Sequence, residues 1–185
     1  MRNLFHCKTV RLDRLDLQEI AVQLHRNELI YDLHFATNRI ARLSFVDDEG
    51  RLKKISSSAQ TDDDANADFI DRLFTSAVAD VKAQTVWASG LQGGRMVTDD
   101  VPEDIEEWNF IFRLPLDWRG QASVLASFIH NYVVFYAASQ WLSLCGLLQQ
   151  SQAFAAQASQ AMSDLVYELR KQSPSAGPRF TDLFN

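Results

Sequence analysis

The alternation of apolar and polar residues predicts two strands. In the segment HCKTVRLDRLDL, Val10 and Leu12 alternate with charged residues, which indicates a strand from about Lys8 to Leu12. A second strand is expected at about 107–114 and is ended by Pro115; its alternating apolar positions are Trp108, Phe110, Phe112 and Leu114. Because a lone strand leaves its backbone groups unsatisfied, we expect these two strands to form a small antiparallel β element.

Spacings of three and four residues predict helices in the remainder of the chain. Leu29, Leu33, Ile40 and Leu43 favour a helix at 27–43, although a strand with Tyr31, Leu33 and Phe35 on one face is the alternative. A clear apolar stripe from Phe69 to Val81 predicts the next helix. Thr61 and Asp62–Asp64 are candidate caps at its start, and Gly90 is a natural stop.

Two more helices are expected at 121–145 and 149–172, with a break near Gly146 and an end at Ser173-Pro174. The fold class is therefore mainly α with a minor β part. It consists of a helical bundle of about four helices and the small antiparallel β element. Residues 1–172 form a single mainly helical domain, and residues 173–185 form an extended C-terminal tail.

The segment from Gln121 to Ser163 contains no Lys, Arg, Asp or Glu, in a chain that is 23% charged. A membrane-spanning helix would have the necessary length, but His130, Asn131 and Gln140 would be costly at mid-depth. The helix could instead fill the core of one chain. A third interpretation buries one face inside the subunit and the opposite face, with Val134 and Trp141, against another subunit, because charges are depleted at interface cores. Val134 and Trp141 are thus the candidate subunit-interface residues.

Composition narrows the classes of partner. The formal net charge of −6 and the pI of about 5.1 argue against general binding to nucleic-acid phosphates, which requires clustered Lys and Arg. The two cysteines imply no disulfide framework, so a reducing compartment is expected. The charged N-terminal segment lacks the apolar run of a secretory signal.

No constellation of residues predicts catalysis, a cofactor or a metal. His6 and Cys7 with His25 or His34 lack zinc-binding spacing, and the run DDDANAD lacks the glycine and the final glutamate of a calcium loop. The glycines of GLQGGR are not followed by the Lys-Ser/Thr of a phosphate loop. His130 and Cys145 are over 20 Å apart along one helix, at about 1.5 Å per residue. We therefore predict no catalytic, cofactor-binding or metal-ligating residues.

The tail SPSAGPRFTDLFN becomes apolar only at its end. Phe180, Leu183 and Phe184 are spaced as anchors after a segment rich in Pro, Gly and Ser. The functional interpretation is a partner-binding tail that docks into a groove of a neighbour, where a few aromatic anchors carry most of the binding energy. The alternatives are that the tail folds onto its own core or has no fixed structure.

The order of segments also resembles a protein family. An N-terminal strand and ATNRIARL are followed by TDDDANADFIDRLFTSAVADVK, FRLPLDW and YVVFYAASQWLSL, and the chain ends with a last helix and LRKQSPSAGPR. This order is similar to that in prophage virion proteins of Bacteroidales, which are themselves similar to head–tail connector (adaptor) proteins. The likeness covers most of the chain after residue 27.

The resemblance implies a homo-oligomeric ring of twelve copies that contacts portal and tail proteins and has no enzymatic activity. It implies a protein of the virion that is assembled in the cytoplasm of the host bacterium. DNA would pass through a negatively charged ring without specific binding, and no membrane is involved. The alternative function is a soluble intracellular helical protein-binding module without catalytic activity.

Overall fold

The structure is a computed structural model, and it describes residues 6–12, 17–41, 44–46, 52–54, 66–89 and 106–171. In chain order the elements are β1 (His6–Leu12), β2 (Leu17–His25), α1 (Arg26–Ala41), β3 (Ser44–Val46), β4 (Leu52–Lys54), α2 (Ala67–Gln84), α3 (Val86–Ser89), β5 (Glu107–Pro115), α4 (Ala122–Leu144) and α5 (Leu148–Leu169). The predicted fold class, mainly α with a minor antiparallel β part, is confirmed.

The principal sheet has three antiparallel strands in the order β1-β2-β5. The strand predicted at 107–114 is confirmed as β5, but its direct pairing with β1 is wrong because β2 lies between them. The core face of the sheet is built from cross-strand pairs of large apolar residues, namely Ile20 with Phe112, Val22 with Phe110, and Leu24 with Trp108. A separate pair, β3 and β4, forms a two-stranded sheet.

The helix at 27–43 is confirmed as α1, and the strand alternative is wrong. The predicted helix that follows is interrupted at Thr85, which separates α2 from the short α3. The Thr85 hydroxyl donates a 2.7 Å hydrogen bond to the carbonyl of Val81, and this local bond accompanies the break. Asn66 is the N-cap of α2, whereas the predicted caps Thr61 and Asp62–Asp64 and the predicted stop Gly90 lie outside the described residues.

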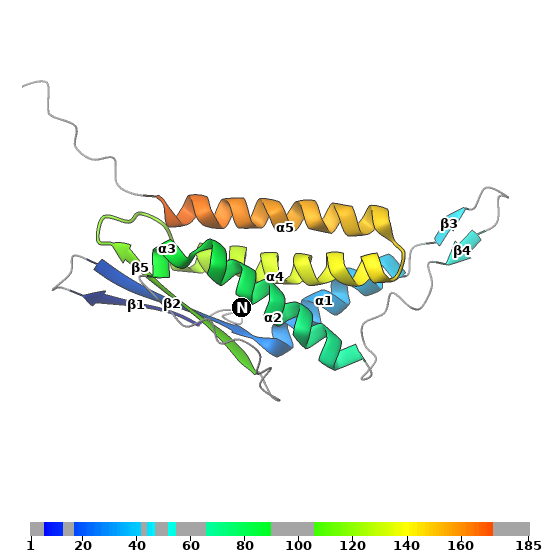
Figure 1. Cartoon of the computed structure of the whole chain (residues 1–185), viewed down its shortest axis with the longest axis horizontal. Coiled ribbons are helices and arrows are strands. Elements are labelled where there is room, and N and C mark those ends of the chain that lie inside the picture. The colour runs from blue at the N-terminus through cyan, green and yellow to red at the C-terminus, as the bar shows by residue number, and fades with distance from the viewer. Residues whose placement is uncertain are drawn as a thin grey trace, which may run out of the picture.

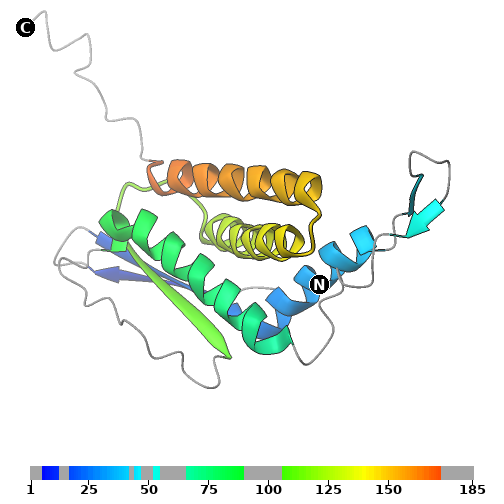
Figure 2. The same ribbon diagram turned by 45° about the vertical axis from the view of Figure 1, so that its right-hand side comes forward.

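Helix α4 is the central element of the molecule. It packs against α5 along its length and against α1, α2 and the sheet on its other sides (Figure 1, Figure 2). Among the described residues, α4 is the one helix with the length and composition to cross a membrane, and 56% of its most apolar window is buried inside the protein. This packing is the arrangement expected of a core helix.

The turn between α4 and α5 reverses the chain within three residues. Gly146 adopts a φ of 77°, in the left-handed region that favours glycine, and its amide donates to the Ser143 carbonyl. The Leu147 amide donates to the Leu142 carbonyl, so the carbonyls at the end of α4 are partly satisfied. The break predicted near Gly146 is confirmed, and α4 and α5 form a helical hairpin.

Candidate interaction surfaces

The two residues proposed as a subunit interface lie inside the chain. Val134 is 4% exposed and Trp141 is 7% exposed. The Trp141 indole lies 6.1 Å from the Phe69 ring of α2, and Ile40 of α1 belongs to the same buried cluster. The prediction that these two residues face a second copy is therefore corrected, because both are buried within the chain and residues of α1 and α2 lie against Trp141. The tail anchors Phe180, Leu183 and Phe184 lie outside the described residues.

The uncharged segment instead reaches the surface on α5. Its inner face buries Ala158, Ala161, Leu165 and Leu169, and the Phe154 ring lies 5.9 Å from Phe135 of α4. Its opposite face is exposed at Gln149, Gln152, Ala153, Ala156, Gln160 and Ser163. We call these six residues the α5 outer face. All six side chains are uncharged, and the small ones, Ala153, Ala156 and Ser163, allow another helix to approach closely, at about 8–10 Å between axes.

Two leucines extend this surface around the turn of the hairpin. Leu144 is 70% exposed and Leu148 is 62% exposed. Single exposed leucines need no explanation, but two on either side of one turn enlarge the uncharged surface with apolar area. The α5 outer face and the two exposed leucines of this turn therefore all lack an ionised side chain.

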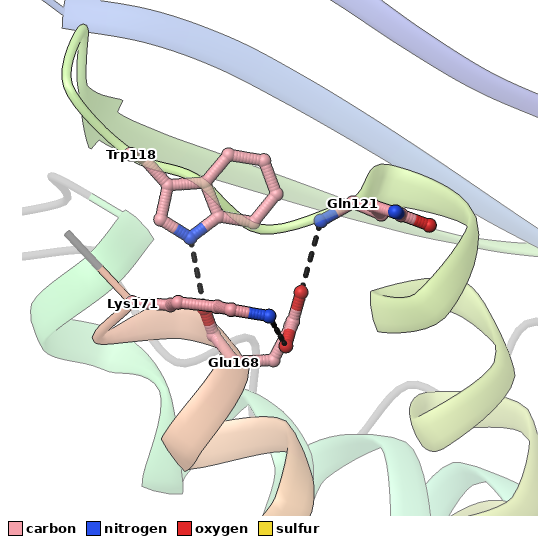
Figure 3. A network of polar contacts seen from close by, with 4 residues as sticks. All are labelled: Trp118, Gln121, Glu168 and Lys171. Atoms are coloured by element: carbon pink, nitrogen blue, oxygen red, sulfur yellow. Dashed lines mark hydrogen bonds and ion pairs between the residues drawn. The ribbon is translucent and has the colours of Figure 1, made fainter. Parts of the chain in front are cut away.

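A network of polar contacts holds the far end of α5 in place (Figure 3). The Trp118 indole donates to the Glu168 carbonyl at 2.8 Å, and the Gln121 amide donates to the Glu168 carboxylate at 2.9 Å. The Nζ of Lys171 lies 3.4 Å from the second carboxylate oxygen of Glu168. Glu168 thus accepts from the N-cap amide of α4, as the glutamate of a capping box would, but it does so from another helix. The network joins the start of α4 and the end of α5 to the turn that follows β5.

A second exposed surface lies on α1. Tyr31 is 70% exposed and Phe35 is 65% exposed, and they lie one turn apart on the side of α1 opposite its buried Leu29 and Leu33. We call Tyr31 and Phe35 the α1 ridge. The sequence contains a signal for it, because these two aromatic residues fall outside the apolar stripe that predicts the helix. Their spacing of four residues also fits the helix, where it places them on one exposed side.

Three ionisable side chains on and just after α4 are buried or partly buried: His130, Tyr132 and Cys145. His130 of α4 is buried, and its Nε2 lies 2.7 Å from Oδ2 of Asp32 on α1. Burial raises the pKa of the Cys145 thiol, which disfavours the reactive thiolate. The phenol of Tyr132 is hydrogen-bonded to Asp80 of α2, and burial together with this carboxylate raises the pKa of Tyr132. Among the described residues, no group of three or more His, Cys, Asp or Glu side chains is placed to bind a metal ion.

Comparison with protein families, with characterised proteins and with solved structures gave no match to this chain. We therefore infer the function from the fold, from the chemistry of the exposed surfaces and from the order of segments in the sequence.

Proposed function

We propose that the protein is a non-catalytic assembly subunit: a head–tail connector (adaptor) of a bacteriophage virion that forms an oligomeric ring between portal and tail. The observation that supports an assembly role is the α5 outer face. It is a long, exposed helical surface with no ionised side chain up to Ser163. The particular assembly comes from the resemblance in segment order to prophage virion proteins.

Exposed helix faces are normally covered with charged residues, which favour contact with water. At 23% charged residues, the chain has ample Lys, Arg, Asp and Glu to cover α5 in this way, yet glutamine, serine and alanine occupy those positions. Alanine has no polar group to dehydrate, and glutamine and serine can replace their bonds to water with hydrogen bonds to a partner, whereas an ionised side chain loses several kcal/mol unless it is paired. The composition of this face is therefore suited to contact with protein.

The overall charge fits the proposed position in the virion. With a formal net charge of −6 per subunit, a ring of copies would be negatively charged as a whole. DNA phosphates would be repelled from such a ring, so DNA would pass through without being held. In this proposal the subunit is assembled in the host cytoplasm, and Phe180, Leu183 and Phe184 dock onto the portal or an adjacent subunit.

Mass photometry and negative-stain electron microscopy test this function. The purified protein, alone and with a portal protein of the same virus, should form closed rings of many 21.0 kDa subunits. Deletion of residues 174–185 should abolish docking to the portal. A monomer at every concentration, with and without the portal, would contradict the proposal. A monomer or dimer that the deletion leaves unchanged would favour the helical protein-binding module instead.

A further inference from the structure

Two exposed surfaces lie on helices that pack on different sides of α4. The α5 outer face lies on the helix that covers one side of α4, and the α1 ridge lies on the helix that packs on another side (Figure 1, Figure 2). The ridge is on the side of α1 away from its buried residues, and the face is on the side of α5 away from α4. A partner of one surface therefore does not block the other.

The two surfaces differ in shape in a complementary way. The α1 ridge consists of two large aromatic side chains one helical turn apart, and both are mostly exposed. The α5 outer face has Ala153 and Ala156 one turn apart, between longer glutamines. Large side chains of one helix fit into the spaces above small side chains of another, which is how packed helices interlock. Tyrosine is also among the residues that most often dominate interface energies.

The distribution of charged side chains favours contact between two copies at the α5 outer face and the α1 ridge. Two copies of net charge −6 repel each other, and none of the six residues of the α5 outer face is ionised. The nearest carboxylate, that of Asp164 at the edge of the face, accepts a 2.9 Å hydrogen bond from the Gln160 side chain. On α1, the carboxylate next to Tyr31 in sequence belongs to Asp32, which is already held by His130 of α4. An approaching α5 would therefore not have to neutralise that carboxylate.

We propose that the α1 ridge of one copy packs onto the α5 outer face of the next copy. The contact itself is inferred from the two surfaces, and only the closure of the copies into a ring rests on the proposed function. Because the two surfaces are different, the contact is head-to-tail, and each copy keeps one ridge and one face for further neighbours. Repetition of such a contact gives a ring if the rotation closes and a filament if it does not. A symmetric α5–α5 contact would instead end at two copies.

Two variants test the contact. Tyr31→Gln with Phe35→Gln removes the ridge, and Ala156→Glu places a charge on the face; all three positions are exposed, so the fold should persist. The matched controls are Ile111→Gln, an exposed apolar residue on β5, and Ala79→Glu, an exposed alanine on α2. Circular dichroism and thermal melting verify the fold, and mass photometry reports the assembly.

Each variant alone should be a monomer, whereas both controls should assemble like the unmodified chain. An equimolar mixture of the two variants should give a species of twice the subunit mass and nothing larger. This follows because the ridge variant keeps its face, the face variant keeps its ridge, and the pair cannot extend.

The outcomes separate the inference from the proposed function. If both variants still form rings, or if the mixture stays monomeric while the unmodified chain assembles, the ridge-to-face contact is wrong and the connector function stands. If the unmodified chain forms only open chains that both variants abolish, the contact is right and the ring is wrong. If the unmodified chain is a monomer under all conditions, both proposals fail.

Discussion

Gly120 lies between the end of strand β5 and the start of α4. Because glycine has no side chain, Trp118 and Glu168 can pack against its backbone. A Cβ at this position would overlap the buried indole of Trp118 and lie 2.8 Å from Oε1 of Glu168. The tight approach of these groups creates the network that joins Glu168 to the Gln121 amide. The sequence offers no sign of this role, because the glycine is indistinguishable from one in an ordinary turn until its neighbours are known.

We expect Gly120→Ala to lower the free energy of unfolding by about 3 kcal/mol, since overpacking of a buried site is costly. Gly146→Ala is the control. Nothing lies within 4 Å of a Cβ there, so its cost of about 1 kcal/mol comes from the positive φ alone. Urea denaturation of both variants measures the difference. An equal loss of stability in the two would show that the Trp118–Glu168 packing around Gly120 can relax.

Tyr132 gives a prediction for alkaline pH. Burial, together with the hydrogen bond and the negative charge of Asp80, raises its pKa above the ordinary value of 10.0. The folded protein therefore keeps the phenolic proton at pH values where the unfolded chain loses it. The stability from this group is complete below pH 10 and decreases as the pH rises above it.

Tyr132→Phe should lower the free energy of unfolding by about 1 kcal/mol at neutral pH, because the bond to Asp80 is lost. The difference from the unmodified protein should shrink as the pH rises above 10. Urea denaturation at a series of pH values checks this result, with Tyr31→Phe, which removes an exposed phenol, as the control. A difference that stays constant with pH would refute the raised pKa.

At the scale of elements, the spacing of apolar residues predicts whether one segment forms a helix or a strand. It does not predict which other segments pack against that helix or strand. The alternating residues of β5 and the apolar stripes of α1 and α2 identify these elements correctly. Strand β2 is not among the predicted elements, although Ile20, Val22 and Leu24 alternate with Glu19, Ala21 and Gln23. Val134 and Trp141 illustrate the limit. Helical periodicity predicts on which side of α4 these residues lie. Whether that side is covered by the same chain or by a second copy depends on how the other helices pack.

The two faces of α5 should respond differently to the same substitution. Ala161 is 6% exposed in the contact with α4, whereas Ala156 is on the α5 outer face. Ala161→Leu should lower the free energy of unfolding by about 1–3 kcal/mol, because the helices must move apart. Ala156→Leu should change it by less than about 0.5 kcal/mol, as is usual for surface positions. Thermal unfolding of both variants measures this, and equal losses would mean that α5 is packed on both sides in the isolated chain.

At the scale of the whole molecule, the pattern of apolar and polar residues predicts the fold class. The function depends in addition on which surfaces stay exposed once the chain has folded. The lack of charge from Gln121 to Ser163 has two causes that the sequence does not separate. In α4 it reflects burial inside the chain, and in the outer half of α5 it leaves an exposed surface of glutamine, serine and alanine. We therefore propose the subunit contact on α5 rather than on α4, with Tyr31 and Phe35 as the surface of opposite shape.

The dependence of self-association on salt distinguishes this kind of contact from one made by ion pairs. Repulsion between copies of net charge −6 is screened as the Debye length falls from about 10 Å at 0.1 M salt to about 3 Å at 1 M. Burial of uncharged surface is not weakened by this screening. The apparent association constant, measured by analytical ultracentrifugation, should therefore stay constant or rise modestly across this range. A tenfold or greater fall would mean that opposite charges hold the copies together, and would exclude the α5 outer face as their main contact.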